Sequence, residues 1–171
     1  DLKTAKDQIE FLNGYCVVKA DGLAAGKGVV VCDTVNEAIE ASTQMLEENK
    51  FGDAGKSILI EERITGIEAS VFAVSDGNTA IVLGTAQDHK RAYDNNQGPN
   101  TGGMGAISPA PALNEELNKN IFDSIIIPTI NGMKSDGIPY EGILYAGVML
   151  TDQGPKAVSY THLTLPTKVA V

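Results

Sequence analysis

The sequence predicts an α+β fold, and two observations support this class. Short apolar runs rich in β-branched residues recur along the chain and predict strands, while longer amphipathic stretches predict helices. In order, the segments read as strand, loop, strand, helix and three strands, followed by a long loop, a helix and a strand. This order favours a small subdomain followed by a larger antiparallel sheet.

We expect the following elements in the first part of the chain. An amphipathic helix covers residues 3–12 and stops at Asn13-Gly14, because glycine after a periodic segment ends a helix. Two strands flank a glycine-rich loop, and a helix follows that begins with a capping box of Thr34 and Glu37. The expected ranges are 15–20 and 28–33 for the strands and 34–50 for the helix.

In the second part, three strands precede a long irregular segment, residues 88–113, whose length and glycine content indicate a functional loop. A helix with Asn114 as its N-cap follows, and we expect Pro128 to kink it. The expected strands are 57–62, 70–75 and 79–84 before the loop, and 141–150 after the helix 114–134.

The chain is acidic, which limits its partners. It has 171 residues, a formal net charge of -9 and 43% hydrophobic residues, enough for the core of one domain or of two small ones. A nucleic-acid partner would require a basic face, so we expect none. Without a signal peptide or an apolar run of membrane-spanning length, we expect a cytoplasmic protein with no membrane partner.

The two cysteines, Cys16 and Cys32, lie in apolar runs. We expect both to be buried thiols in strands, and we consider a disulfide or a metal pair less favoured. The histidines, His89 and His162, do not have the spacing of a zinc site with them.

The segment 87–109 is the strongest functional signal. It begins with Asp88, His89, Lys90 and Arg91 and continues into a glycine-rich turn. Glycine allows successive N–H groups to point at one anion, and the cations supply the opposite charge. We therefore predict a phosphate or acyl-phosphate site, with the turn residues Asn100, Thr101, Gly102 and Gly103.

Two lysines flank the first glycine-rich loop, where Lys19 ends a strand and Lys27 lies at the loop tip. The loop is not a Walker A motif, because the glycine spacing is one residue too short and Gly28 follows Lys27. Both lysines are candidates to bind one polyphosphate, and two solvated lysines on a hairpin are the alternative. The glycines of this candidate site are Gly22, Gly26 and Gly28.

Acidic residues gather where the third strand ends. Glu61 and the backbone of Ile64 are candidates to face adenine, and Glu68 to bind a ribose diol, with Glu62 as a further candidate. The alternative is that these carboxylates are simply solvated.

Taken together, these motifs resemble the ATP-grasp family and, within it, the phosphoribosylamine–glycine ligases, also called glycinamide ribonucleotide synthetases. The resemblance runs from about residue 15 to Lys156 through VVKADGLAAGKGV, FGDAG, IEERITGIEAS, QDHKRAYDNNQGPNTGGMGAISPAP and LYAGVML. It implies an enzyme of purine biosynthesis that uses ATP to phosphorylate the glycine carboxylate, after which the amine of 5-phosphoribosylamine attacks the acyl phosphate.

The resemblance also implies roles for residues. Lys19 and Lys27 would bind the ATP phosphates, with Lys27 on a closing flap that excludes water. Glu61 and Ile64 would face adenine, and Glu68 the ribose. The catalytic candidates are Lys27, His89, Lys90 and Arg91, and the substrate-binding candidates are Asp88, Asn100, Thr101, Gly102 and Gly103.

One departure from the family concerns magnesium, or manganese in its place. The family carries a Glu-Phe-Asn triplet whose Glu and Asn bind the metal, and these positions correspond to Ser159 and Thr161 here. Hydroxyl groups do not replace a carboxylate on a hard cation, so we assign no metal ligands. We expect residues 157–171 to be a non-native tail that leaves the strand at 143–150 with an unpaired edge.

The expected organisation is the end of a preceding helix (1–14), a flap subdomain (15–75), an incomplete core subdomain (76–156) and the tail (157–171). The chain thus reads as an internal fragment that lacks the amino- and carboxy-terminal domains of its parent, and we expect no ligase activity from it. Two alternatives remain: an ATP-grasp ligase for another carboxylate, and a non-catalytic nucleotide-binding module.

Overall fold

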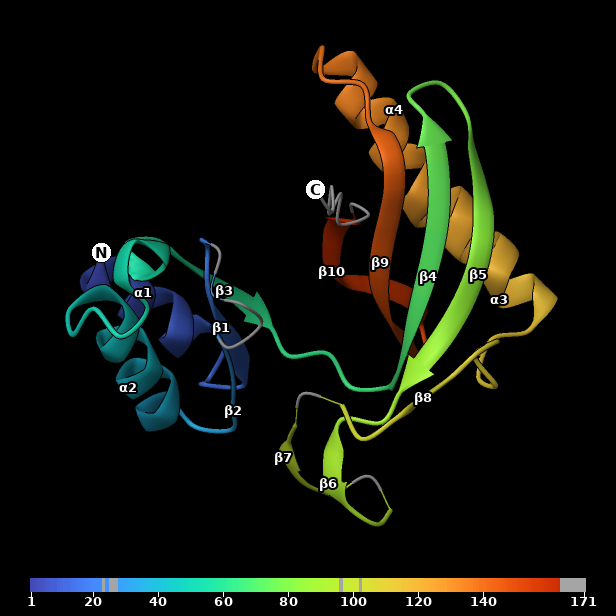
Figure 1. The fold of residues 1–171 in the computed structure, drawn as a ribbon. Helices are drawn as coiled ribbons and strands as arrows, with labels where there is room; N and C mark the ends of the chain where they lie inside the picture. Colours follow the sequence, from blue (N-terminus) through green and yellow to red (C-terminus); the bar gives the residue numbers. More distant parts are fainter. Residues whose placement is uncertain (23, 25–27, 96, 102, 164–171) are drawn as a thin grey trace, which may run out of the picture. The chain divides into compact units, whose positions relative to one another are not determined.

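The protein consists of two compact units, residues 1–64 and 65–171 (Figure 1). The computed structural model describes residues 1–22, 24, 28–95, 97–101 and 103–163, and of residues 99, 100, 162 and 163 only the backbone. The boundary lies at Ile64, whereas the sequence analysis placed it after residue 75. The physical reason is that the strand following Ile64 pairs along its whole length within the second sheet.

The first unit is a three-stranded antiparallel sheet with two helices. The strand order is β2-β1-β3, with β1 between its neighbours. The expected helices and strands of this part are confirmed to within four residues at their ends. Their bounds are α1 (Leu2–Phe11), β1 (Cys16–Ala20), β2 (Val29–Cys32), α2 (Val35–Leu46), the short 3-10 helix η1 (Gly52–Gly55) and β3 (Ile58–Glu62).

Both helices pack on one face of this sheet. Ile9 of α1 and Met45 of α2 lie with Val18 of β1 in one buried cluster, and fully burying such a side chain stabilises a fold by roughly 1.5–3 kcal/mol. Cys16 and Cys32 face each other in the β1–β2 register and are completely buried free thiols, as expected. Burial raises the pKa of both thiols, that of Cys32 to about 11.

The start of α2 follows from its sequence. The Thr34 hydroxyl accepts a hydrogen bond from the Glu37 N–H at 3.3 Å. The Glu37 carboxylate accepts one from the Asp33 N–H at 2.8 Å, one residue before the position that a capping box uses. The cap is therefore confirmed in kind, with its second hydrogen bond displaced.

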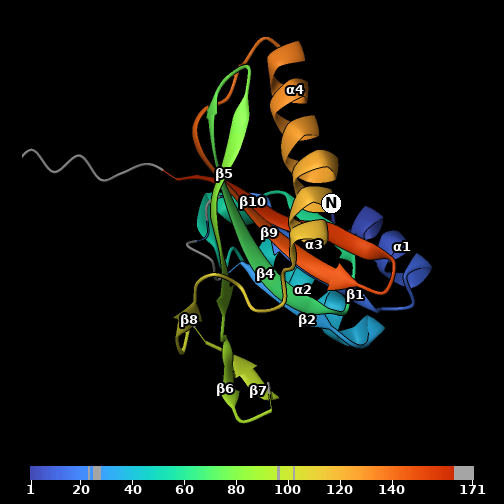
Figure 2. The same cartoon turned by 90° about the vertical axis from the view of Figure 1, so that its right-hand side faces the viewer.

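The second unit is a five-stranded antiparallel sheet in the order β10-β9-β4-β5-β8, with a helical segment along one face (Figures 1 and 2). A separate two-stranded hairpin, β6–β7, extends beyond the end of the sheet. The strands are β4 (Ile67–Asp76), β5 (Ala80–Asp88), β6 (Arg91–Tyr93), β7 (Gln97–Asn100), β8 (Ala106–Ile107), β9 (Glu141–Thr151) and β10 (Gly154–Leu163).

The helical segment consists of α3 (Glu115–Ile121), a π-helical turn η2 (Phe122–Ile126) and α4 (Ile127–Ser135). Asn114 caps it, since its side chain accepts a hydrogen bond from the Leu117 N–H at 2.8 Å. Pro128 stands in the first turn of α4. The π turn lies directly before it, which is where a helix relaxes its hydrogen bonding to accommodate proline.

The core of this unit lies between the helices and the sheet. Ile126 and Ile130 pack with Leu144, and Ile121 packs with Val71 and Val148. These strand residues alternate with residues whose side chains lie on the opposite face of the sheet. The opposite face therefore carries half-buried and polar side chains.

Two expectations about this unit are corrected. The segment 88–113 contains β6, β7 and β8 rather than irregular backbone alone. The edge of β9 is paired, because β10 runs beside it from Gly154 to Leu163. Strand pairing uses backbone groups, so a tail that lacks the family's side chains can still occupy the edge. In the part of the chain that the structure describes, no helix is long and apolar enough to cross a membrane.

Candidate functional site

The face of the first sheet that carries no helix holds Lys19 and Glu61. Val17 lies opposite Glu61 in the β1–β3 register, and Lys19 lies opposite Leu59, so these residues share one face of the sheet. The Lys19 ammonium reaches across to the Glu61 carboxylate, with 2.5 Å between Nζ and Oε2. The structure therefore brings together the two residues that sequence analysis assigned to the phosphate and adenine ends of a nucleotide.

Apolar side chains surround this ion pair. Val29 and Val31 of β2 lie opposite Lys19 and Val17, so they belong to the same face. Val29 is 50% exposed, Val31 44% and Leu59 47%, although they stand in regular strands. These three residues were not predicted as site residues. The signal was present, since apolar residues occur at every position of β2 and not only at alternate ones.

The remaining candidates of the first unit lie around this face. Glu62 lies opposite Cys16, so its side chain is directed toward the other face, and the structure does not bring it to Lys19. Gly22 packs closely on Ala54, since an added Cβ would lie 2.5 Å from the Ala54 Cα. An added Cβ at Gly28 would lie 2.7 Å from the Ala24 Cβ. Gly26 and Lys27 lie outside the described residues.

In the second unit, Lys90 pairs with Glu68 of β4. Burial lowers the pKa of Lys90, but the hydrogen bond and the charge of Glu68 outweigh it, with smaller contributions from Tyr145 and Asp88, so the pKa is raised overall. Lys90 therefore remains an ammonium ion at neutral pH. Such a cation beside a carboxylate can exchange that partner for a phosphate or hydroxyl group of a ligand.

The charged run and the glycine-rich turn are antiparallel partners. The N–H of His89 donates to the Gly105 carbonyl at 2.9 Å, and the N–H of Thr101 donates to the Lys90 carbonyl at 2.6 Å. Arg91 donates through Nη1 to the Gly98 carbonyl at 2.7 Å. Residues far apart in the segment are thus held side by side.

Several N–H groups of the expected anion nest have partners within the loop. The N–H of Met104 donates to the His89 carbonyl, and that of Gly103 donates to the Thr101 hydroxyl. Together with Thr101, these N–H groups are used within the loop and do not point at an anion. Gly103 has φ +119° and lies against Asp88, whose Oδ1 would be 3.2 Å from an added Cβ. Gly102 and the side chain of Asn100 lie outside the described part of the chain.

The open face of the second sheet includes Ser159 and Thr161, which the resemblance places at the expected metal positions. Ser159 lies opposite Gly147, which in turn lies opposite Ser70, and Thr161 lies opposite Tyr145. Among the described residues there is no group of three or more His, Cys, Asp or Glu side chains that could hold a metal ion. The residues present therefore do not fit a magnesium site.

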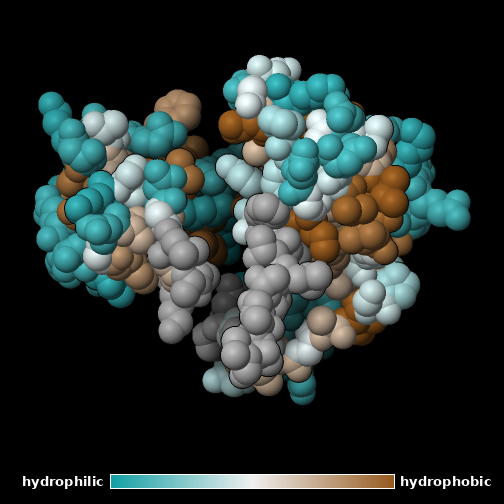
Figure 3. All heavy atoms as spheres, turned by 45° about the horizontal axis from the view of Figure 1, so that its top comes forward, coloured by the Kyte–Doolittle hydropathy of each residue, from teal (hydrophilic) through white to brown (hydrophobic). Residues whose placement is uncertain are grey.

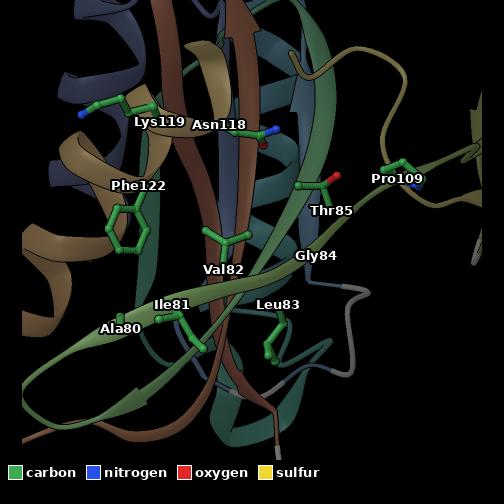
Figure 4. Close-up of a pocket in the computed structure, with 10 residues that line it drawn as sticks. All are labelled: Ala80, Ile81, Val82, Leu83, Gly84, Thr85, Pro109, Asn118, Lys119 and Phe122. Atoms are coloured by element: carbon green, nitrogen blue, oxygen red, sulfur yellow. The ribbon is translucent and has the colours of Figure 1, made fainter. Parts of the chain in front are cut away.

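A separate groove of about 640 Å³ lies on the other side of the second unit (Figure 4). Val82 of β5 points toward Phe122 and Asn118, while Ile81 and Leu83 lie on the other side of the strand. Ile81 and Leu83 are among the exposed apolar side chains of this unit, whose surface shows a hydrophobic patch in Figure 3. None of the predicted site residues lines this groove.

The sequence matches a family model, that of the ATP-grasp (A) domain of phosphoribosylglycinamide synthetase, over residues 1–162. This match includes the first residues of the expected foreign tail. Among curated relatives, the phosphoribosylamine–glycine ligase of Rhodopirellula baltica is 56% identical over 144 residues, 84% of this chain and 33% of that protein. That of Streptococcus pneumoniae is 50% identical over 160 residues, 94% of this chain and 38% of that protein.

The fold agrees with these relatives. The crystal structure of phosphoribosylamine–glycine ligase from Thermotoga maritima superposes with a TM-score of 0.81 at 32% identity, and the match covers 94% of this chain and 41% of that one. The chain therefore spans only a third to two fifths of the length of the proteins that it matches.

Proposed function

The chain belongs to the phosphoribosylglycinamide synthetase family as part of its ATP-grasp domain, and we propose on this premise that it forms the adenine-nucleotide-binding part of a ligase. The parent protein would join glycine to 5-phosphoribosylamine at the expense of ATP, through a glycyl phosphate. The name of the relatives, phosphoribosylamine–glycine ligase, supports the joining of these two substrates.

The observation that carries the nucleotide site is the open face of the first sheet. An adenine ring needs an apolar surface, and Val29, Val31 and Leu59 expose one. A triphosphate needs a cation, which Lys19 supplies on the same face. Glu61 lies within reach of that cation and would accept a hydrogen bond from the adenine amino group, with the Ile64 backbone beside it.

In the second unit, the ion pair of Lys90 with Glu68 would serve an acyl phosphate. A glycine carboxylate is a poor electrophile because it is negatively charged and has no good leaving group. Transfer of the γ-phosphoryl group removes part of that charge and creates a phosphate leaving group. Lys90, with His89 and Arg91 next to it, would hold the acyl phosphate electrostatically.

The residues at the metal positions favour a second candidate for this chain as it stands. Ser159 and Thr161 offer no carboxylate, so the chain would bind a nucleotide without transferring its phosphoryl group. The proposal therefore has two parts: nucleotide binding by this chain, and ligation by the parent.

Calorimetric titration of the purified chain with ATP tests the first part, and Lys19→Gln serves as the variant. We expect saturable binding by the wild type and at least a tenfold weaker affinity in the variant. Absence of binding by the wild type would refute the proposed nucleotide site. For the second part, ADP release by a full-length relative should depend on glycine, and release that depends on formate or bicarbonate instead would identify another ligase.

A further inference from the structure

Arg63, the residue after β3, contacts the ends of both other strands of the first sheet. Its guanidinium lies 4.6 Å from the ring centroid of Tyr15, the residue directly before β1. Its Nη1 pairs with the Asp33 carboxylate and donates to the Cys32 carbonyl at 3.4 Å, at the end of β2. Its own N–H donates to the Tyr15 carbonyl at 3.4 Å. One residue thus ties three strand ends together.

The contacts of Arg63 differ from those of an ordinary surface ion pair. The Arg63 side chain is only 21% exposed, whereas its partner Asp33 is 68% exposed. An exposed pair contributes little because two long side chains must be ordered in water. Here the planar guanidinium stacks on a ring and meets two acceptors at once, which restricts it to one orientation.

Arg63 also stands within the segment proposed to recognise the base. Glu61 and the Ile64 backbone are the groups expected to face adenine, and Arg63 lies between them. The guanidinium stacks on the Tyr15 ring, and its Nη1 is engaged with Asp33 and Cys32, so these contacts are all with the protein's own strand ends. We therefore expect its effect on a nucleotide to pass through the backbone that it holds.

We propose that Arg63 is a positioning residue for the base-recognising segment 61–64. This inference rests on the proposed nucleotide site. By fixing the chain where it leaves β3, Arg63 sets the Ile64 backbone and the Glu61 carboxylate at the spacing that an adenine edge requires. Adenine presents an amino donor where guanine presents a carbonyl acceptor, so this spacing governs the preference for adenine over guanine.

The test compares ADP with GDP, two ligands with the same phosphates and ribose. Calorimetry would give both affinities for the wild type, Arg63→Ala, Arg63→Lys and the control Lys56→Ala, whose exposed pair with Asp53 lies in the same unit. We expect Arg63→Ala to weaken ADP about tenfold and GDP less than twofold, because an aligned hydrogen bond is lost only for adenine. Arg63→Lys retains the charge but not the planar guanidinium, so its ADP affinity should lie between those of the wild type and Arg63→Ala. Lys56→Ala should have the affinities of the wild type.

The outcomes separate this inference from the proposed function. An ADP-to-GDP affinity ratio that stays at the wild-type value in Arg63→Ala, including equal losses for both ligands, would show a merely structural role and overturn the inference. If Arg63→Ala does not fold, the ratio in Arg63→Lys decides in the same way. A wild-type chain that binds neither nucleotide would overturn the proposed function, and the inference with it.

Discussion

Lys19 of β1 and Glu61 of β3 form an ion pair across one face of the first sheet. The two residues are diagonal neighbours on the paired strands, since Lys19 lies opposite Leu59 and Glu61 lies opposite Val17. A carboxylate thus neutralises the lysine that is proposed to hold the nucleotide phosphates. Phosphate oxygens would then compete with Glu61 for the ammonium, which leaves the carboxylate available to the adenine amino group.

The exchange of partners at Lys19 gives the first prediction. Glu61→Gln should raise the affinity for inorganic tripolyphosphate two- to fivefold, because the phosphates no longer have to displace a carboxylate from Lys19. The attraction between two such partly exposed charges contributes up to about 1 kcal/mol. The same variant should lose affinity for ADP relative to GDP. Calorimetry with the three ligands measures both effects, and Asp53→Asn is the control. A fall in tripolyphosphate affinity would contradict the competition.

The exposed valines give the second prediction. Val31→Thr keeps the β-branched shape and replaces a methyl group by a hydroxyl, so the fold should be little affected. If adenine packs on this face, the variant should bind ADP about fourfold more weakly, since a buried methyl group contributes about 0.8 kcal/mol. Val82→Thr on β5 of the other unit is the matched control and should bind as the wild type does. Equal affinities for all three proteins would place the base elsewhere.

The Lys90–Glu68 pair predicts a pH dependence. The pKa of Lys90 in the folded state is raised, so its contribution to stability is fully present below the unfolded value of about 10.4 and is lost as the pH rises through the folded pKa. Glu68→Gln should therefore lower the free energy of unfolding more at pH 8 than at pH 11.5. Both side chains are more than a third exposed, so solvent screening limits the difference to less than about 1 kcal/mol.

Urea unfolding at the two pH values measures this difference, and a nitrogen-detected titration of the Lys90 ammonium measures the pKa directly. Asp123→Asn, which breaks the exposed pair with Lys119 in the same unit, should leave the Lys90 titration unchanged. A Lys90 pKa that is the same in the wild type and in Glu68→Gln would refute the assignment.

The helices and the strands β1 to β5 and β9 were predictable because each carries a local signal. The apolar run in β4 and the cap of α2 are properties of a few neighbouring residues, and both elements occur close to where the sequence places them. The ion pair of Lys19 with Glu61 was not predicted from the sequence. The strand register explains it, because β1 and β3 are distant in sequence but pair with each other and place both side chains on one face.

The features that the sequence did not predict depend on pairing between residues far apart in the chain. The glycine-rich turn has the composition of an anion nest, yet the N–H groups of Thr101 and Met104 bond to the charged run, and that of Gly103 bonds to the Thr101 hydroxyl. The segment after Lys156 lacks the family's side chains, yet its backbone pairs with β9. Arg63 drew no attention in the sequence because its three partners lie 30 residues or more away.

Two glycines predict opposite effects of the same substitution. Gly14 has φ +74°, and an added Cβ would lie 2.1 Å from the Val35 backbone nitrogen. Gly14→Ala should therefore destabilise the first unit by about 2–4 kcal/mol through strain and displacement of α2. Gly132 lies within α4, where an added Cβ meets nothing within 4 Å. Gly132→Ala should stabilise the second unit by about 0.5–1 kcal/mol. Calorimetric melting of both variants checks this, and a stable Gly14→Ala would contradict the close contact.

The two thiols provide a built-in reporter of local opening. Both cysteines of the sequence belong to the first unit, where they are completely buried and their raised pKa keeps them protonated. A thiol reagent can therefore react only when this unit opens, while the second unit contributes no signal. The labelling rate measures the opening free energy of the first unit alone, without any introduced probe. Its retardation by a bound nucleotide would show that the nucleotide holds the first unit closed.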